Sequence, residues 1–321
     1  RRDSRSRDQR GRTRGCAERT AMAKLRLQPR SVIAKVYVFL TLFMFAFMVF
    51  LPPVMKALAG EIRAAEAMFR KQCSAEQSQW PPWSHGRRVK ECVEHMVATK
   101  VAREVIVPFD VTLKHFRYPG ILSTHHLGAF LWLSAGLAQF GLSRAGPAER
   151  RRHRLVGYIF LLSAILIAVG FIQIVWHNLF AAYDYHALFP HEVSLPSRAE
   201  YLMTVGIHSS LQLWFLFTAG KAWAAAGRRR FEEHRTWIVR HMASGGWVVV
   251  MRVIISLSQG VIYTAMRLGW APVGGALKHD LFGISAGLGV LVSFATAELY
   301  LLTSLRSMDA SMAVVRTTVA A

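Results

Sequence analysis

Long apolar stretches alternate along the chain with short polar connections. Six stretches approach the roughly 20 apolar residues that a helix needs to cross a bilayer at 1.5 Å per residue. They cover approximately residues 31–58, 121–142, 155–177, 201–225, 237–263 and 283–305. The pattern therefore predicts an all-α integral membrane bundle that crosses the bilayer about six times.

Positive charge is concentrated in every second connection. Lys and Arg precede the first apolar stretch, and they fill the connections at 144–154 and 228–235. The intervening connections are neutral or acidic and carry Asp184, Glu192 and Asp280. Because basic connections stay on the cytoplasmic side of a membrane, we expect a bacterial inner (plasma) membrane protein with both termini cytoplasmic.

The connection at 60–120 is the one long polar piece, and by parity it lies outside. It predicts two amphipathic helices, about 61–78 and 87–103, separated by the sequence WPPWSHG. Cys73 and Cys92 lie on the two arms. An oxidising compartment would join them in a disulfide, whereas a reducing lumen would leave two free thiols.

The predicted spans and connections divide the chain into five parts. They are a basic disordered leader at 1–30, a first anchor at 31–58, an extracytoplasmic helical hairpin at 59–120, a four-helix core at 121–263, and a last part at 264–321 with the sixth helix and a cytoplasmic tail. Residues 1–21 carry almost no apolar side chains, so we interpret Met22 as the true start. The alternative, a transit peptide, is disfavoured by the acidic Asp3, Asp8 and Glu18.

The composition supports a membrane protein and limits the classes of function that the chain can have. The chain is 53% hydrophobic and 18% charged, with a formal net charge of +21. Since the basic residues lie between apolar stretches and not on one folded face, the bilayer is the expected partner and nucleic acid is not. There is no dinucleotide-binding glycine motif, no pair of catalytic carboxylates and no nucleophile beside a base, so no enzymatic reaction is assigned.

Histidines repeat at corresponding positions of the core. His153 follows His126 by 27 residues, and His234 follows His208 by 26. By helical rise, His126 and His208 lie about 10 Å below the outer ends of their helices. His153 and His234 lie at the inner edge, and His241 is about two turns deeper on the face of His234. The chain is thus a repeated hairpin with two layers of histidine.

Paired imidazoles inside a bundle are what a six-coordinate b-type haem requires. The layers predict one or two haems in a transmembrane electron carrier with a redox partner or quinone. The outer ligands would be His126 and His208, and the inner ligands His153 with His234 or His241. Three alternatives remain open. The inner pair could snorkel to lipid headgroups, the histidines could relay protons in a transporter, or the protein could be a sensor or assembly subunit whose Trp80 and Trp83 contact a partner.

Two charges fall inside predicted spans. Arg252 lies near the middle of 237–263, and Glu298 lies in the inner half of 283–305, so an ion pair between them would compensate both charges. Alternatively, Arg252 could meet a cofactor propionate or an anionic substrate. Small residues could let a flat macrocycle approach a helix backbone, namely Gly128, Gly136, Gly157, Gly170 and Gly220.

The stretch from about 126 to 252 resembles an uncharacterised family of multispan bacterial membrane proteins, domain of unknown function 2306. The resemblance rests on the sequence HRLVGY at 153–158 and on HRTWIVR at 234–240, with His126 in the preceding helix. It implies a membrane fold and no established activity, and His208 departs from the family pattern. The arrangement is also similar in topology to cytochrome b561, in which histidines of alternate helices hold two haems.

Overall fold

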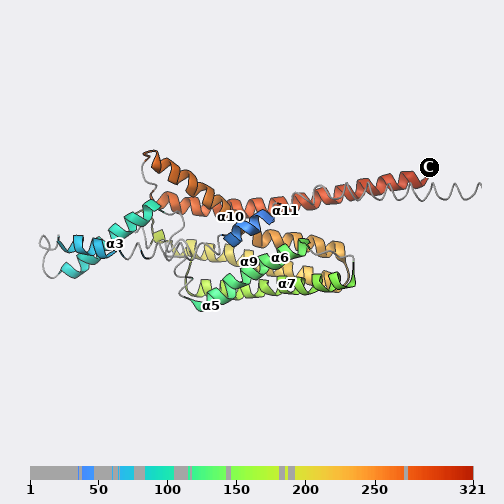
Figure 1. The fold of residues 1–321 in the computed structure, drawn as a ribbon, viewed down its shortest axis with the longest axis horizontal. Helices are drawn as coiled ribbons and strands as arrows, with labels where there is room; N and C mark the ends of the chain where they lie inside the picture. Colours follow the sequence, from blue (N-terminus) through green and yellow to red (C-terminus); the bar gives the residue numbers. More distant parts are fainter. Residues whose placement is uncertain are drawn as a thin grey trace, which may run out of the picture.

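The structure of the chain is a computed structural model that describes residues 35, 38–46, 60, 64, 66–75, 84–104, 115, 118–141, 146–180, 185–186, 192–270 and 274–320. Within these residues every regular element is helical, as predicted (Figure 1). The predicted leader at 1–30 lies outside the described residues, as do Trp80 and Trp83. Of the predicted first anchor, residues 35 and 38–46 are described, and they are helical.

Four helices are long and apolar enough to cross a membrane: α7 (Pro147–Trp176), α9 (Arg198–Gly227), α10 (Phe231–Arg267) and the part of α11 (Gly275–Ala320) that ends at residue 304. They correspond to four of the predicted spans, so the protein is an integral membrane protein by length and composition. The helices extend beyond their predicted apolar limits. Pro147 occupies the first turn of α7 after Gly146, where its missing N–H costs nothing, so the arginines at 150–154 are helical.

The second predicted span is helical but not uniform. It consists of α5 (Pro119–Ile121), the π-helical turn η3 (Leu122–His126) and α6 (Leu127–Gly141). The hydroxyls of Ser123 and Thr124 donate to the carbonyl of Gly120, at 3.1 and 2.6 Å. These bonds satisfy a carbonyl at the point where the α pattern changes.

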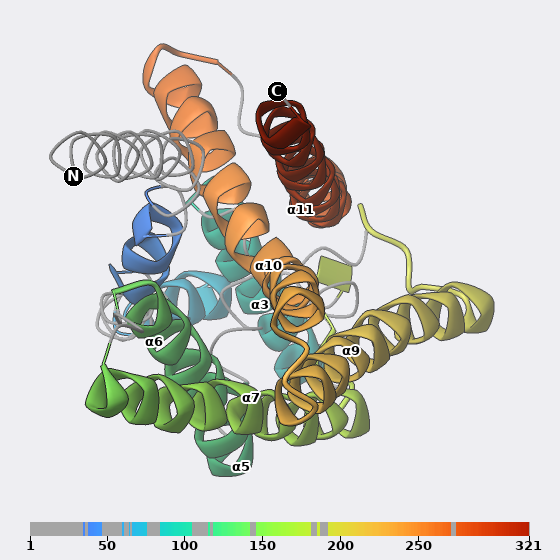
Figure 2. The same ribbon diagram turned by 90° about the vertical axis from the view of Figure 1, so that its right-hand side faces the viewer.

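Helices α6, α7, α9 and α10 enclose one apolar core, and α11 lies beside α10 (Figure 2). Each of the four contributes a buried residue to this core, namely Trp132, Phe160, Phe215 and Val249. Helix α11 approaches α10 closely at Gly289, where an added Cβ would lie 2.7 Å from the carbonyl oxygen of Trp247. These four helices therefore pack around a shared apolar core, to which Met44 also contributes, and α11 packs against α10.

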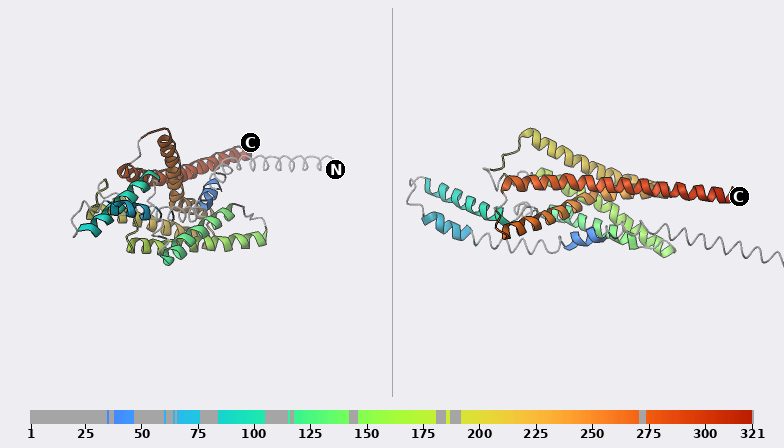
Figure 3. Two further views of the ribbon diagram at one scale, coloured as in Figure 1. Left: turned by 60° about the vertical axis from the view of Figure 1, so that its left-hand side comes forward. Right: turned by 90° about the horizontal axis from the view of Figure 1, so that it is seen from above.

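The bundle has two chemically different ends (Figure 3). The connections from α6 to α7 and from α9 to α10 lie at one end, which we name the Arg-rich end after residues 150–154 and 228–230. Helix α3 (His85–Glu104) lies towards the opposite end, which we name the hairpin end.

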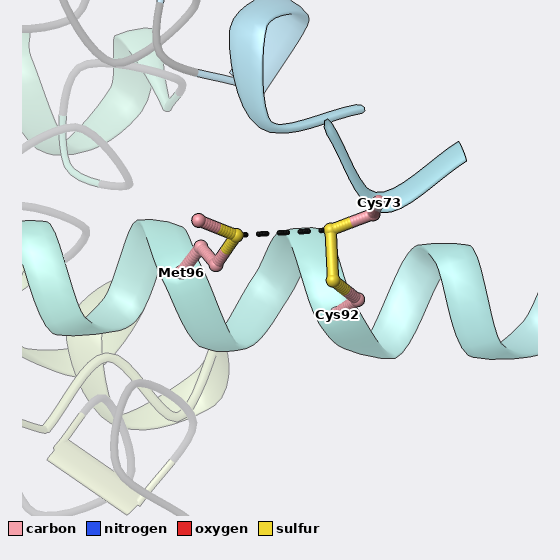
Figure 4. The surroundings of a disulfide bond; sticks show 3 residues. All are labelled: Cys73, Cys92 and Met96. Carbon is pink, nitrogen blue, oxygen red and sulfur yellow. Dashed lines mark hydrogen bonds between the residues drawn. A yellow bond between two sulfur atoms is a disulfide. The ribbon is translucent and has the colours of Figure 1, made fainter. Parts of the chain in front are cut away.

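The predicted disulfide is confirmed (Figure 4). Cys73 and Cys92 are bonded with a Cα–Cα distance of 6.0 Å, and Cys73 is fully buried. The Sδ of Met96 lies 3.7 Å from the Sγ of Cys73, one turn along α3 from Cys92. The bond therefore holds the helical residues 66–75 against α3.

Candidate functional site

Three imidazoles meet at the hairpin end of the core, and we name them the histidine cluster: His115, His125 and His126. The Nε2 of His126 lies 3.4 Å from the Nδ1 of His115, and their ring centroids are 5.5 Å apart. The rings of His125 and His126 are 5.8 Å apart. The cluster is positioned by η3, because His125 and His126 are its last two residues.

Helix α7 fixes the orientation of the cluster. The Nδ1 of His125 lies 3.4 Å from the carbonyl oxygen of Ile167. A Cβ on Gly170 would lie 2.5 Å from the backbone nitrogen of His125, so only glycine permits this approach. Gly128 likewise faces the backbone of α7, with Ile167 N 3.1 Å from an added Cβ. These two glycines serve helix packing, and the space predicted for a macrocycle beside them is filled.

A cation and a phenol accompany the cluster. Arg252 of α10 is close enough to interact electrostatically with the histidines and with Tyr185. The side chain of Tyr185 is buried, with its ring 5.5 Å from that of His279. Burial raises the pKa of Tyr185 above its ordinary value. Burial, followed by the nearby His125 and Arg252, lowers the pKa of His115 to about 4, so His115 is neutral at pH 7.

His208 lies in the same half of the bundle but does not join the cluster. Its Nδ1–H donates to the carbonyl of Thr204 at 2.8 Å, which leaves Nε2 available. Its described ring contacts are with Phe180 at 5.6 Å and Trp247 at 6.3 Å, and not with His126. Since Trp247 and Arg252 are about 7.5 Å apart along α10, His208 and the cluster lie at neighbouring levels.

His241 has a different environment from the one predicted for a ligand. The indole N–H of Trp132 donates to its Nε2 at 2.9 Å, and its Nδ1–H donates to the carbonyl of Phe215 at 3.1 Å. The ring is fully buried, and it stacks on Phe215 with a centroid distance of 4.4 Å. Because both nitrogens are engaged, neither is available to a metal.

His153 and His234 lie on separate hairpins. The Nδ1–H of His234 donates to the carbonyl of Ala222 at 2.8 Å, which joins α10 to α9. The carbonyl of His153 accepts from Nε2 of Gln139 at 2.7 Å, which joins α7 to α6. No described contact brings the two imidazoles together. His241 is thus excluded as a ligand of the predicted inner haem, whereas a role for His153 and His234 stays a prediction. The imidazoles at the hairpin end offer nitrogen donors of the kind that haem iron takes.

The predicted partner of Glu298 is wrong. Its carboxylate accepts from Nε of Arg240 at 2.7 Å and from Nη2 at 3.0 Å, not from Arg252. Arg240 and Arg252 are about 18 Å apart along α10. The antiparallel packing of α11 on α10 therefore brings Glu298 to the level of Arg240.

The chain matches no family model, no curated protein and no solved structure. The resemblance described above therefore rests on its quoted motifs alone. Within the described residues, no group of three or more His, Cys, Asp or Glu could hold a metal ion.

Sequence reasoning missed two members of the site. His115 and Tyr185 both lie in connections, at positions without a helical period that would have assigned them to a face. The HH pair at 125–126 was visible, but an α-helical period turns the two rings about 100° apart. The π turn changes the angle between the two rings, and no sequence signal in residues 122–126 predicts a π turn.

Proposed function

We propose that this multispan membrane protein is an electron carrier with one b-type haem in the hairpin-end half of its core. His126 and His208 would hold it. The observation that carries the proposal is the set of imidazoles at this end, which includes an Nε2 on His208 left available by the Nδ1–H bond to Thr204. A bound haem would supply one-electron chemistry, with a redox partner or a quinone as the second component.

The chemistry of the neighbouring residues supports a single haem. Haem iron takes only two protein ligands, so the absence of a described group of three ligands does not count against it. His126 would exchange its contact with His115 for the iron. Arg252 would provide a cation for a propionate group beside the cluster. A second haem would have to use His153 and His234, since His241 has no available nitrogen, and the proposal is confined to one haem.

The proposed location is a bacterial inner membrane with the Arg-rich end in the cytoplasm. The positive-inside rule supports this orientation, since the arginines at 150–154 and 228–230 share one end. The disulfide at the other end supports it as well, because such bonds persist in oxidising compartments. The haem would then lie nearer the extracytoplasmic surface.

An absorption spectrum before and after dithionite tests the proposal. Protein purified from a haem-replete host should show a Soret band and a reduced α band, and both should be lost in His126→Ala and in His208→Ala. The matched control is His234→Gln, which alters a histidine bonded to Ala222 at the Arg-rich end and should keep the bands. Absence of bands in the wild type, or bands unchanged in both variants, would refute the proposal.

One observation favours a second function, proton-coupled transport. The Nδ1 of His115 and the Nε2 of His126 lie 3.4 Å apart, and Arg252 interacts electrostatically with both histidines and with Tyr185. Two ring nitrogens at this distance can pass a proton between them. The measurement that separates the two is proton uptake into liposomes with a pH-sensitive dye. Uptake that is lost in His115→Ala, from a protein without a haem spectrum, would favour transport.

A further inference from the structure

The motif HRLVGY at 153–158 has a part that the proposed function does not use. Arg154 lies three residues after Arg151 and four before Tyr158, and Leu155 lies four residues after Arg151 and three before Tyr158. All four therefore lie on one side of α7. All four are exposed within the chain. Farther along the same face, Leu162 is also exposed. The face is therefore cationic at its beginning, aromatic next and aliphatic beyond.

The aromatic part of this face continues onto α9. The ring of Tyr158 lies 5.2 Å from the ring of Trp223, centroid to centroid. Both rings are about half exposed, Tyr158 at 49% and Trp223 at 45%. Tyr and Trp are characteristic of the level where lipid headgroups meet acyl chains. The pair thus marks the headgroup level at the seam between α7 and α9.

The cations above the pair are not neutralised by the protein. Within the described residues, neither Arg151 nor Arg154 forms an ion pair. Two acids at this end pair with other arginines, Glu233 with Arg230 and Glu232 with Arg235. Glu149, in the first turn of α7, forms no described ion pair with Arg151 or Arg154. Arg154 precedes Tyr158 by four residues, or about 6 Å of helical rise. Arg154 therefore lies about one turn, and Arg151 about two turns, above the exposed aromatic pair.

We propose that the α7–α9 seam at the Arg-rich end is a binding site for one anionic phospholipid. Arg151 and Arg154 bind the phosphate of the headgroup, because guanidinium groups match phosphate oxygens in geometry and charge. Tyr158 and Trp223 contact the glycerol region, and Leu155 and Leu162 contact an acyl chain. Along α7 the cationic, aromatic and aliphatic side chains follow one another in the same order as the phosphate, glycerol and acyl chain of a phospholipid. A free phosphate would contact only the two arginines.

The site does not depend on the haem proposal and is tested without it. Purified protein is titrated in detergent with phosphatidylglycerol or with phosphatidylcholine, and bound lipid is counted by native mass spectrometry. The wild type should retain one phosphatidylglycerol in preference to phosphatidylcholine. The double variant Arg151→Gln with Arg154→Gln should weaken that binding about 30-fold, since each arginine near a phosphate contributes roughly fivefold.

The matched control is Arg228→Gln with Arg229→Gln, which removes the same charge at the same end but in the turn after α9. This control should bind as the wild type does. Trp223→Ala with both arginines intact should also weaken binding, which a purely electrostatic surface would not show. Equal losses in the two arginine double variants, no preference for the anionic lipid, or displacement by millimolar inorganic phosphate alone would each overturn the proposal.

Discussion

The imidazole of His241 is held from three helices at once. Trp132 of α6 donates to it, Phe215 of α9 accepts from it, and the ring of Phe160 on α7 meets it edge-on at 5.2 Å. A polar group in the middle of an apolar bundle is stable only when its donors and acceptors are all paired. The bonds around His241 meet this condition, so we interpret it as the polar centre of the core.

Replacing His241 by Ala should destabilise the protein by about 2–4 kcal/mol. The change leaves the indole N–H of Trp132 without its described partner and opens a cavity, whereas the carbonyl of Phe215 keeps its bond from the hydroxyl of Thr218. Thermal unfolding in detergent measures the loss. The matched control is His234→Ala, a half-buried histidine with one bond to Ala222, which should cost about 1 kcal/mol or less. Equal losses in both variants would contradict this interpretation of His241.

The phenol of Tyr185 should make stability depend on alkaline pH. Burial raises its pKa in the folded state above the ordinary value near 10. Above pH 10 the unfolded chain therefore ionises first, and the stability present below pH 10 is lost as pH rises. Unfolding midpoints recorded from pH 8 to 11 should fall less steeply in Tyr185→Phe than in the wild type. Parallel profiles would show that this phenol titrates normally.

At the scale of elements, α11 is fastened to α10 by charge. Arg240 and Glu298 form two bonds, and Arg235 donates to the hydroxyl of Tyr300 at 2.7 Å. Glu298→Gln removes one charge of the bidentate pair and should cost about 1 kcal/mol, or about 2–4 °C in the unfolding midpoint. The double reversal Arg240→Glu with Glu298→Arg should recover most of it.

The control for this pair is Glu233→Gln. Glu233 pairs with Arg230 at 3.4 Å within one exposed helical turn, where such pairs contribute little. The unfolding midpoint of Glu233→Gln should stay close to that of the wild type. A larger loss in Glu233→Gln than in Glu298→Gln would contradict the assignment of Glu298 as the link between the two helices.

The hairpin depends on its disulfide in a different way. Cys73→Ser removes a crosslink between positions 19 residues apart and should destabilise the hairpin by about 2–3 kcal/mol. Limited proteolysis should then cleave within 66–104 faster, while the membrane bundle persists. Met96→Leu is the control, because it alters the sulfur contact and leaves the crosslink. Identical proteolysis of wild type and Cys73→Ser would refute the stabilising role.

At the scale of the whole molecule, the orientation predicts which end each reagent can reach. With Cys16 replaced by Ser, a membrane-impermeant thiol reagent added to intact spheroplasts should label Arg87→Cys on α3. It should not label Arg229→Cys until the membrane is opened. Labelling of both variants in intact spheroplasts would contradict the assignment of the Arg-rich end to the cytoplasm.

The sequence predicted the helical spans well and their ends poorly. An apolar run predicts the part of a helix that lies in lipid, but it does not predict where the helix begins. Because arginine is a good helix former, α7 already begins at Pro147, before its first apolar run. The disulfide was predictable because compartment and cysteine number leave few choices. The hairpin repeat was predictable because its histidines recur at nearly equal spacing.

The partners of buried polar groups were not predictable in the same way. His241 meets Trp132 across 109 residues of chain, and Glu298 meets Arg240 and not Arg252. Both outcomes depend on the register between packed helices, which is decided by side-chain volumes along whole interfaces. Local periodicity assigns a residue to a face and a depth, but it does not identify the neighbour at that depth.

The π turn at η3 gives the histidine cluster an unusual sensitivity. A π turn accommodates one residue more than an α turn, so deleting a single residue from 122–126 would rotate everything before it by about 100° relative to α6. His115 and its neighbours would then face a different helix with no change in their chemistry. The direction in which these rings point is therefore determined by the number of residues in one turn as much as by the residues themselves.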